Sequence, residues 1–191
     1  MTPVQDIDLH TNEENSLLYL LLAQPESINS MNLAMIKKLQ ASHCVPLLVT
    51  VNQPFKILSK VYKAGGVDPE SIYAVDAVTL YSGGEPVPNP KLRYVNNPGN
   101  LTDLGIAITE ILKIMPKGKK CILFDSVSML LIHITTVNAA KFLHFVVNKL
   151  KLSDVSGIFL CVEKGVDPVV IAQMSATVDK IVDFESENKS N

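Results

Sequence analysis

The sequence predicts an α/β fold, a three-layer α/β/α sandwich around a mostly parallel central sheet. Short apolar runs with the length of buried strands alternate with segments in which apolar residues recur at helical spacing. The apolar runs are almost continuous, which is typical of strands buried on both faces. Repeated alternation of strands and helices favours parallel strands whose connecting helices cover both faces of the sheet.

Seven segments are predicted as strands. Their ranges are 17–23, 45–51, 71–78, 92–95, 119–125, 156–162 and 180–184. The strand at 92–95 is short, and the last residue of the strand at 119–125 is an aspartate. Between the third and fourth lies 79–91, with two adjacent glycines and three prolines at alternate positions, which exclude a helix or a central strand. We expect an exposed loop there, either one that contacts a partner or an inert connector.

Five segments are predicted as helices, each from an apolar stripe or from a start or stop signal. Gly65-Gly66 ends the helix predicted at 55–64, and Asn100 or Thr102 caps the next one. Asp167 followed by Pro168 begins the last predicted helix. These helices contain the stripe Met31, Met35, Ile36 and Leu39; the range 55–64; a segment from Asn100 or Thr102 to about Met115; the face formed by Ala139, Phe142, Leu143, Val146 and Leu150; and a segment from Pro168.

Length and composition indicate one globular domain. The 191 residues are 47% apolar, and we assign 1–16 to a polar N-terminal tail, 17–185 to the domain and 186–191 to a polar C-terminal tail. With 17 basic and 19 acidic residues, the chain has no strong positive field, so nucleic-acid binding is not expected. No apolar run approaches the ~20 residues of a membrane span, and the acidic start does not resemble a signal peptide. Three cysteines without a CxxC pair fit a reducing compartment, so we expect a cytoplasmic protein.

The carboxyl ends of the strands are the places to search for chemistry, because ligands of parallel α/β sheets bind there. The residues concerned are 24–30, 52–54, 125–128 and 163–165.

The first strand-to-helix turn, AQPESINS, has the length and place of a phosphate-binding loop of pattern GxxxxGK[ST]. Ala23 stands at the first glycine, Ile28 at the second, Asn29 at the lysine and Ser30 at the Mg²⁺-binding hydroxyl, with Ser27 between. Three of the four defining positions are therefore altered. A β-branched residue resists positive φ and would fill the phosphate cradle, and Asn29 brings no charge. The other interpretation of this turn is an ordinary strand–helix connection.

Asp125 ends an apolar strand at the predicted ligand-binding edge. In nucleotide hydrolases an acid at this place holds Mg²⁺, a hard cation that prefers oxygen ligands. A structural role, in which the carboxylate accepts hydrogen bonds from neighbouring loop amides, is the alternative.

Several segments together resemble the RecA-fold P-loop ATPase domain of the KaiC/RadA group, including its archaeal members. They are LLYLLLAQPESINS, PLLVTVNQPFKILSKVYKAGGVDPESIYAVDAV, KKCILFDSVSMLL, TVNAAKFLHFVVNKLK and GIFLCVEKGVDPVVIAQMSATVDKIVDFE. The resemblance covers nearly the whole chain after about Glu14 and implies a RecA-like P-loop NTPase fold.

The resemblance also implies a lost activity. Members that hydrolyse ATP carry two glutamates after the second strand, one of which activates water, and here Asn52 and Gln53 stand in their place. Amides cannot act as general bases. The expected site is therefore a vestigial nucleotide site without catalytic residues, formed by Ala23, Ser27, Ile28, Asn29, Ser30, Asn52, Gln53 and Asp125.

The predicted function is that of a catalytically inactive RecA/KaiC-like domain, a pseudo-ATPase that regulates or scaffolds by binding. It would need no cofactor and would assemble with itself or with an active RecA/KaiC-like relative. The alternative is a nucleotide-binding protein or slow ATPase with a non-standard P-loop, in which Ser30 and Asp125 would hold the metal of Mg-ATP. The sequence offers no acid–base or nucleophile pair for another kind of enzyme.

Overall fold

The computed structural model describes residues 7, 16–162, 164 and 166–183. Seven strands within these residues form one sheet in the order β4-β3-β2-β5-β6-β1-β7, and every neighbouring pair is parallel. The strands are β1 (Leu18–Ala23), β2 (Val45–Thr50), β3 (Tyr73–Asp76), β4 (Leu92–Tyr94), β5 (Lys120–Asp125), β6 (Ser156–Val162) and β7 (Lys180–Asp183).

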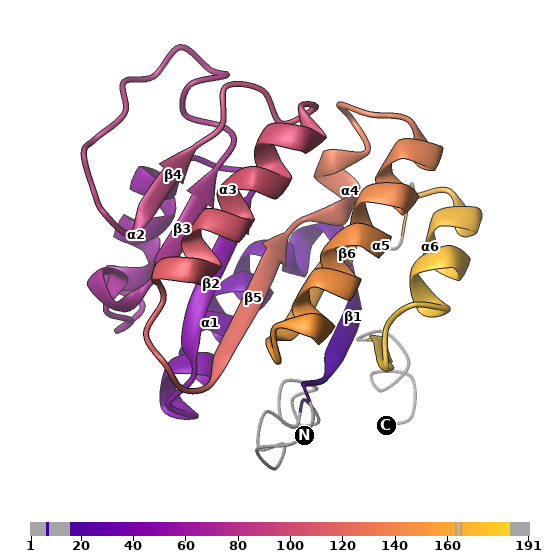
Figure 1. Ribbon diagram of the computed structural model, residues 1–191, viewed down its shortest axis with the longest axis horizontal. Helices are drawn as coiled ribbons and strands as arrows, with labels where there is room; N and C mark the ends of the chain where they lie inside the picture. The colour runs from indigo at the N-terminus through magenta and orange to yellow at the C-terminus, as the bar shows by residue number, and fades with distance from the viewer. Residues whose placement is uncertain (1–6, 8–15, 163, 165, 184–191) are drawn as a thin grey trace.

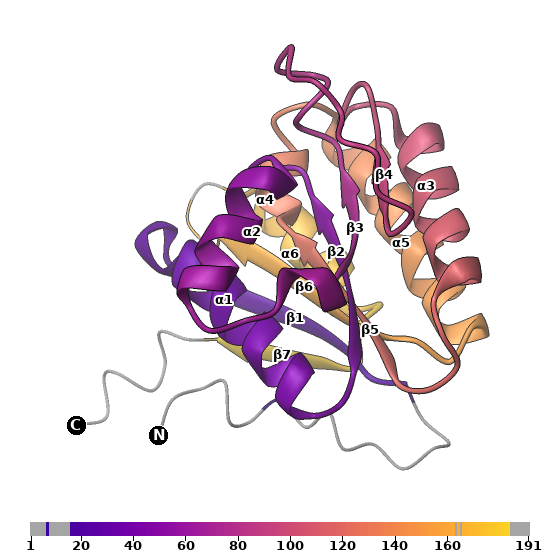
Figure 2. The same ribbon diagram turned by 90° about the vertical axis from the view of Figure 1, so that its left-hand side faces the viewer.

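Helices cover both faces of the sheet, which confirms the predicted three-layer α/β/α sandwich (Figure 1). Seen from the side, α1 and α2 lie on one face and α3 and α5 on the other (Figure 2). The α-helices are α1 (Ile28–Ala41), α2 (Phe55–Ala64), α3 (Leu101–Ile114), α4 (Val127–Leu130), α5 (Thr136–Leu152) and α6 (Pro168–Ser175). Two 3₁₀ turns, η2 (Pro25–Ser27) and η3 (Pro69–Ser71), precede α1 and β3.

The apolar strands serve two separate cores because successive side chains of a strand point to opposite faces. In β1, Leu18, Leu20 and Leu22 join the core under α3, α5 and α6. The alternate residues Tyr19 and Leu21 join the core under α1 and α2. This division explains why the predicted strands lack alternating polar residues.

The predicted helix signals act as expected. Asn100 caps α3 by accepting from Asp103 N, and Asp167 caps α6 by accepting from Val169 N. The 79–91 segment is an exposed loop without helix or strand, as predicted. Within the described ranges, no helix combines the length and apolar character required to cross a bilayer. Residue 184, most of the predicted N-terminal tail and the whole predicted C-terminal tail lie outside the described residues.

Candidate functional site

The carboxyl ends of the parallel strands meet at one edge of the sheet. There Thr50 of β2 lies in register with Asp76 of β3 on one side and with Asp125 of β5 on the other. All three side chains are buried. The Asp125–Ser126 peptide bond is cis. Register alone thus places two carboxyl groups at the edge where the sequence predicts a ligand.

The first strand-to-helix turn is compact. Ala23 ends β1 in a buried position, and η2 leads directly into α1. Ser27, the N-cap residue of α1, makes no side-chain capping bond. Ile28 has helical backbone angles, φ −58° and ψ −42°, and its side chain packs in the core under α1 and α2. The chain therefore passes from strand to helix through a 3₁₀ turn, and the Ile28 side chain lies in the core, not in a phosphate cradle.

Ser30 and Asn29 are exposed and make local contacts. The Ser30 hydroxyl donates to the Ser27 carbonyl oxygen at 2.8 Å. Gln53 Nε2 donates to Asn29 Oδ1 at 3.3 Å, which joins the first turn to the turn after β2. The Thr50 hydroxyl closes this second turn, because it donates to Gln53 O at 2.7 Å and accepts from Gln53 N. Two predicted site residues, Asn29 and Gln53, are thus brought together, and Ser30 is bonded within its own turn.

Asp125 belongs to a buried polar chain that crosses from β5 to the helices. Asn32 Nδ2 of α1 donates to Asp125 Oδ2 at 2.8 Å, and Tyr62 of α2 donates its hydroxyl to Asn32 Oδ1 at 2.5 Å. Asn32 is 2% exposed and Tyr62 is fully buried. One carboxylate oxygen is therefore held by an amide that is itself oriented by a phenol.

The other oxygen, Asp125 Oδ1, is buried and accepts no hydrogen bond from any described residue. Burial raises the pKa of the Asp125 carboxyl to about 6, against the lowering effect of the Asn32 hydrogen bond and, second to it, of the nearby Asn52 side-chain amide. Burial, and to a lesser extent the Asp125 charge, raises the pKa of the Tyr62 hydroxyl. The phenol therefore stays protonated and available as a donor.

Asp76 is the second buried acid of this edge, and its role is different. Its carboxylate accepts from the backbone N–H groups of Phe55, Val78 and Thr79 and from the Thr79 hydroxyl, at 2.6–2.8 Å. The bond to Phe55 ties the end of β3 to the start of α2. Asp76 thereby fixes the turn that contains Asn52 and Gln53.

The sequence interpretation missed Asn32, Tyr62 and Asp76. A signal existed for Asn32, because a residue four after Ile28 and four before Ile36 lies on the apolar stripe of α1. A polar side chain on such a stripe requires a buried partner. Its partner lies 93 residues away, and no periodicity identifies it.

A Tyr62→Phe variant tests this polar chain. We expect it to lower the free energy of unfolding by about 1–2 kcal/mol, because Asn32 Oδ1 would lose its donor in a buried place. Urea denaturation followed by circular dichroism measures the change. Tyr73→Phe, at a half-buried tyrosine of β3, is the control and should change stability by less than about 0.5 kcal/mol. An equal small effect of both variants would contradict the proposed importance of the phenol.

The described residues offer little for a resident metal. No three His, Cys, Asp or Glu side chains in this part of the chain gather closely enough to hold an ion. A hollow of about 450 Å³ does open beyond the carboxyl end of β6, between Ser128, Thr136 and Lys164 among others. None of the eight residues of the predicted nucleotide site lines it, although Ser128 and Lys164 belong to the predicted edge ranges 125–128 and 163–165. Residues 163 and 165 lie outside the described residues.

Comparison with known proteins supports the fold alone. No protein-family model matches the sequence, and no curated protein matches it significantly. The structure is similar to the crystal structure of the uncharacterized protein PH0321 from Pyrococcus horikoshii, which was solved in complex with an unknown peptide. The TM-score is 0.62 at 14% sequence identity, over 87% of this chain and 76% of that chain. At this identity, the similarity shows a shared α/β architecture.

Proposed function

We propose that this chain is a RecA/KaiC-like domain without ATPase activity that regulates or scaffolds by binding another protein. The observation that carries the proposal is the Asn32–Asp125 hydrogen bond. In an ATPase of this type the acid after the strand faces Mg²⁺, and here an uncharged amide occupies one of its oxygens. The compact first turn and the amides Asn52 and Gln53 support the same proposal.

The residues do not fit a Mg-nucleotide as they stand. Ser30, the predicted metal-binding hydroxyl, is bonded to Ser27 O, and Asn29, at the lysine position, is bonded to Gln53. No positive side chain of the first turn is available to offset phosphate charge, since Ala23–Ser30 contains none. The residues at this edge therefore support no catalytic step.

Thermal unfolding with Mg-ATP tests the first half of the proposal. We expect millimolar Mg-ATP to shift the melting temperature by less than about 1 °C, because the site should not bind it. A ligand that did bind, at 100 times its Kd, would raise the free energy of unfolding by about 2.7 kcal/mol. The matched control is Asp125→Asn, which should respond to nucleotide as the wild type does. A stabilisation by Mg-ATP that the Asp125→Asn variant loses would overturn the proposal.

The second candidate, a nucleotide-binding protein or slow ATPase with a non-standard P-loop, has one observation in its favour. Asp125 Oδ1 is buried without a hydrogen-bond partner among the described residues, and a cation would satisfy it. Calorimetric titration with Mg-ATP separates the two candidates, since only this one gives saturable heat.

Binding of another protein is the second half of the proposal. The similar protein PH0321 was solved with an unknown peptide, and several large apolar side chains of this chain are exposed. They include Ile106, Val137, Phe145 and Leu152 on α3 and α5. Exposed apolar patches are typical of interaction surfaces. The partner classes that we propose are a second copy of the chain or an active RecA/KaiC-like relative, and light scattering with chemical cross-linking tests both.

A further inference from the structure

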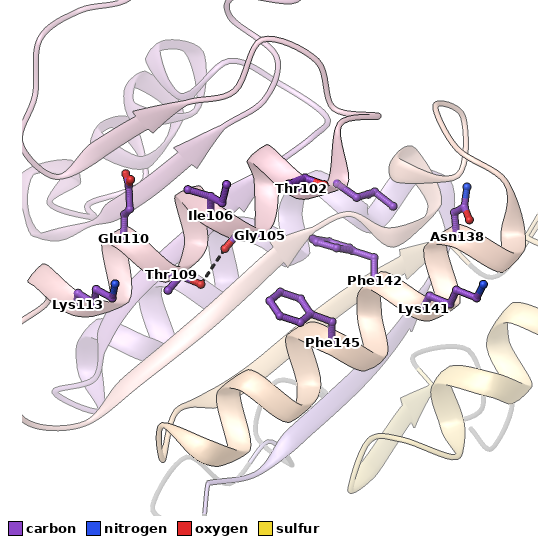
Figure 3. A pocket seen from close by; sticks show the side chains of 11 residues that line it. Thr102, Gly105, Ile106, Thr109, Glu110, Lys113, Asn138, Lys141, Phe142 and Phe145 are labelled. Carbon is purple, nitrogen blue, oxygen red and sulfur yellow. Dashed lines mark hydrogen bonds between the residues drawn. The ribbon is translucent and has the colours of Figure 1, made fainter.

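A groove of about 640 Å³ runs between α3 and α5, on the sheet face opposite α1 and α2 (Figure 3). We call it the α3–α5 groove. No residue of the predicted nucleotide edge lines it. The residues that line it include Gly105, Ile106 and Lys113 of α3 and Lys141, Phe142 and Phe145 of α5.

The centre of the groove is apolar and partly open to solvent. Ile106 is 52% exposed and Phe145 is 48% exposed, whereas the neighbouring Phe142 ring is almost buried. The two rings lie 6.4 Å apart between centroids. A Cβ at Gly105 would lie 3.1 Å from Phe145 Cε1, so the glycine lets the two helices come close at this point. No side chain in the described part of the chain covers this apolar surface of Ile106 and Phe145 completely.

The groove carries unbalanced positive charge. Glu110 is paired with Arg93 at 3.2 Å. Lys113 and Lys141 are exposed, and neither forms an ion pair with a described residue. Figure 3 shows Lys113 toward the C-terminal end of α3 and Lys141 near Asn138 toward the other end of the groove. Charge complementarity therefore favours an occupant with acidic side chains beside its apolar ones.

The walls of the groove favour a helical occupant over an extended one. Both walls are α-helices, whose backbone N–H and C=O groups bond within the helix. The Thr109 hydroxyl donates to Gly105 O at 2.9 Å and is also engaged. An extended peptide would find few partners for its backbone, whereas a helix satisfies its own. The lining stretch from Leu101 to Lys113 is about 18 Å long, which matches three to four helical turns.

We propose that the α3–α5 groove is the docking site for an amphipathic helix of a partner protein. That helix would place an apolar stripe on Ile106 and Phe145 and acidic side chains near Lys113 and Lys141. The proposal rests on the protein-binding half of the proposed function. A second copy of the chain is a poorer occupant through α2, because Lys56, Lys60 and Lys63 make that amphipathic helix basic.

The test uses a displayed library of helical peptides of about 14 residues, with randomised apolar positions and either acidic or basic borders. Selected peptides are titrated against the full chain by fluorescence anisotropy. We expect binders from the acidic set, with affinity lowered at least about tenfold by Ile106→Glu or Phe145→Glu. Lys113→Glu and Lys141→Glu should each weaken binding about threefold to tenfold.

The control is Ile57→Glu, at an exposed isoleucine of α2 on the opposite face, which should bind as the wild type does. Circular dichroism of each variant checks that the fold is intact. The inference would be overturned by a library without binders, by binders with basic borders, or by an affinity that the groove variants leave unchanged. So would a homodimer, seen by light scattering, that Phe145→Glu abolishes. Nucleotide response is measured separately, so a Mg-ATP effect would defeat the pseudo-ATPase proposal and leave this one standing.

Discussion

An Asp125→Asn variant is expected to be more stable than the wild type by about 2 kcal/mol near pH 7.5. The folded-state pKa of about 6, against an ordinary value of 3.8, means that folding disfavours the ionised carboxyl by about 3 kcal/mol. Because the folded protein holds this proton more tightly than the unfolded chain, the wild type loses stability as pH rises from about 4 through about 6. Asparagine keeps an acceptor for Asn32 without the charge, so the advantage of the variant should disappear near pH 4.

Urea denaturation at several pH values measures this difference. Glu85→Gln is the matched control, because it removes one carboxylate from the exposed 79–91 loop and should follow the wild-type pH profile. A loss of stability in Asp125→Asn near pH 7.5 would contradict the prediction. It would indicate that the fold uses the ionised form, as a bound cation at Oδ1 requires.

An Asp76→Ala variant is expected to lose about 4 kcal/mol of unfolding free energy. The Asp76 carboxylate accepts four hydrogen bonds, and its removal would leave the N–H groups of Phe55, Val78 and Thr79 without their acceptor. Bonds to a charged acceptor contribute more than neutral ones, and buried donors without partners are costly. Urea denaturation checks the value, with Asp76→Asn expected to lose about half as much.

Asp68→Ala is the control for this variant. Asp68 also accepts a backbone N–H, from Glu70, but the bond is exposed and single. We expect a loss of no more than about 1 kcal/mol. An equally small loss in Asp76→Ala would contradict the prediction and would mean that water replaces the carboxylate.

Strand register places Asp76 and Asp125 at the same edge of the sheet, but their hydrogen bonds give them different roles. Both end a parallel strand, and both lie beside Thr50. Both carboxylate oxygens of Asp76 accept hydrogen bonds from backbone N–H groups, one from Phe55 and one from Val78, so its role is structural. Asp125 has one oxygen bonded to a distant amide and one without a described partner. In the sequence, Asp125 is the last residue of the predicted strand 119–125, whereas Asp76 lies within the predicted strand 71–78, so only the structure shows that both acids end a strand.

The sequence predicted the strands and helices well because their signals are local. The ranges predicted at 45–51 and 156–162 correspond to β2 and β6, and the helix predicted at 55–64 is α2. Asn100 and Asp167 cap helices because their side chains reach N–H groups two or three residues ahead. The sequence does not decide the roles of Ser30 and Asp125, because each role depends on which group forms a hydrogen bond with the side chain in the folded protein.

The three-layer architecture can be predicted from the sequence. Continuous apolar runs force burial on both faces of the sheet, and the helical stripes between them supply the covering layers. The tertiary structure alone sets what surrounds Asp125, because Asn32 reaches it from α1 across 93 residues of chain and Tyr62 of α2 in turn holds Asn32. It likewise decided that α3 and α5 lie side by side with Ile106 and Phe145 uncovered. Hydrogen bonding and packing act over a few ångströms, and periodicity along the chain does not specify which distant side chains come that close.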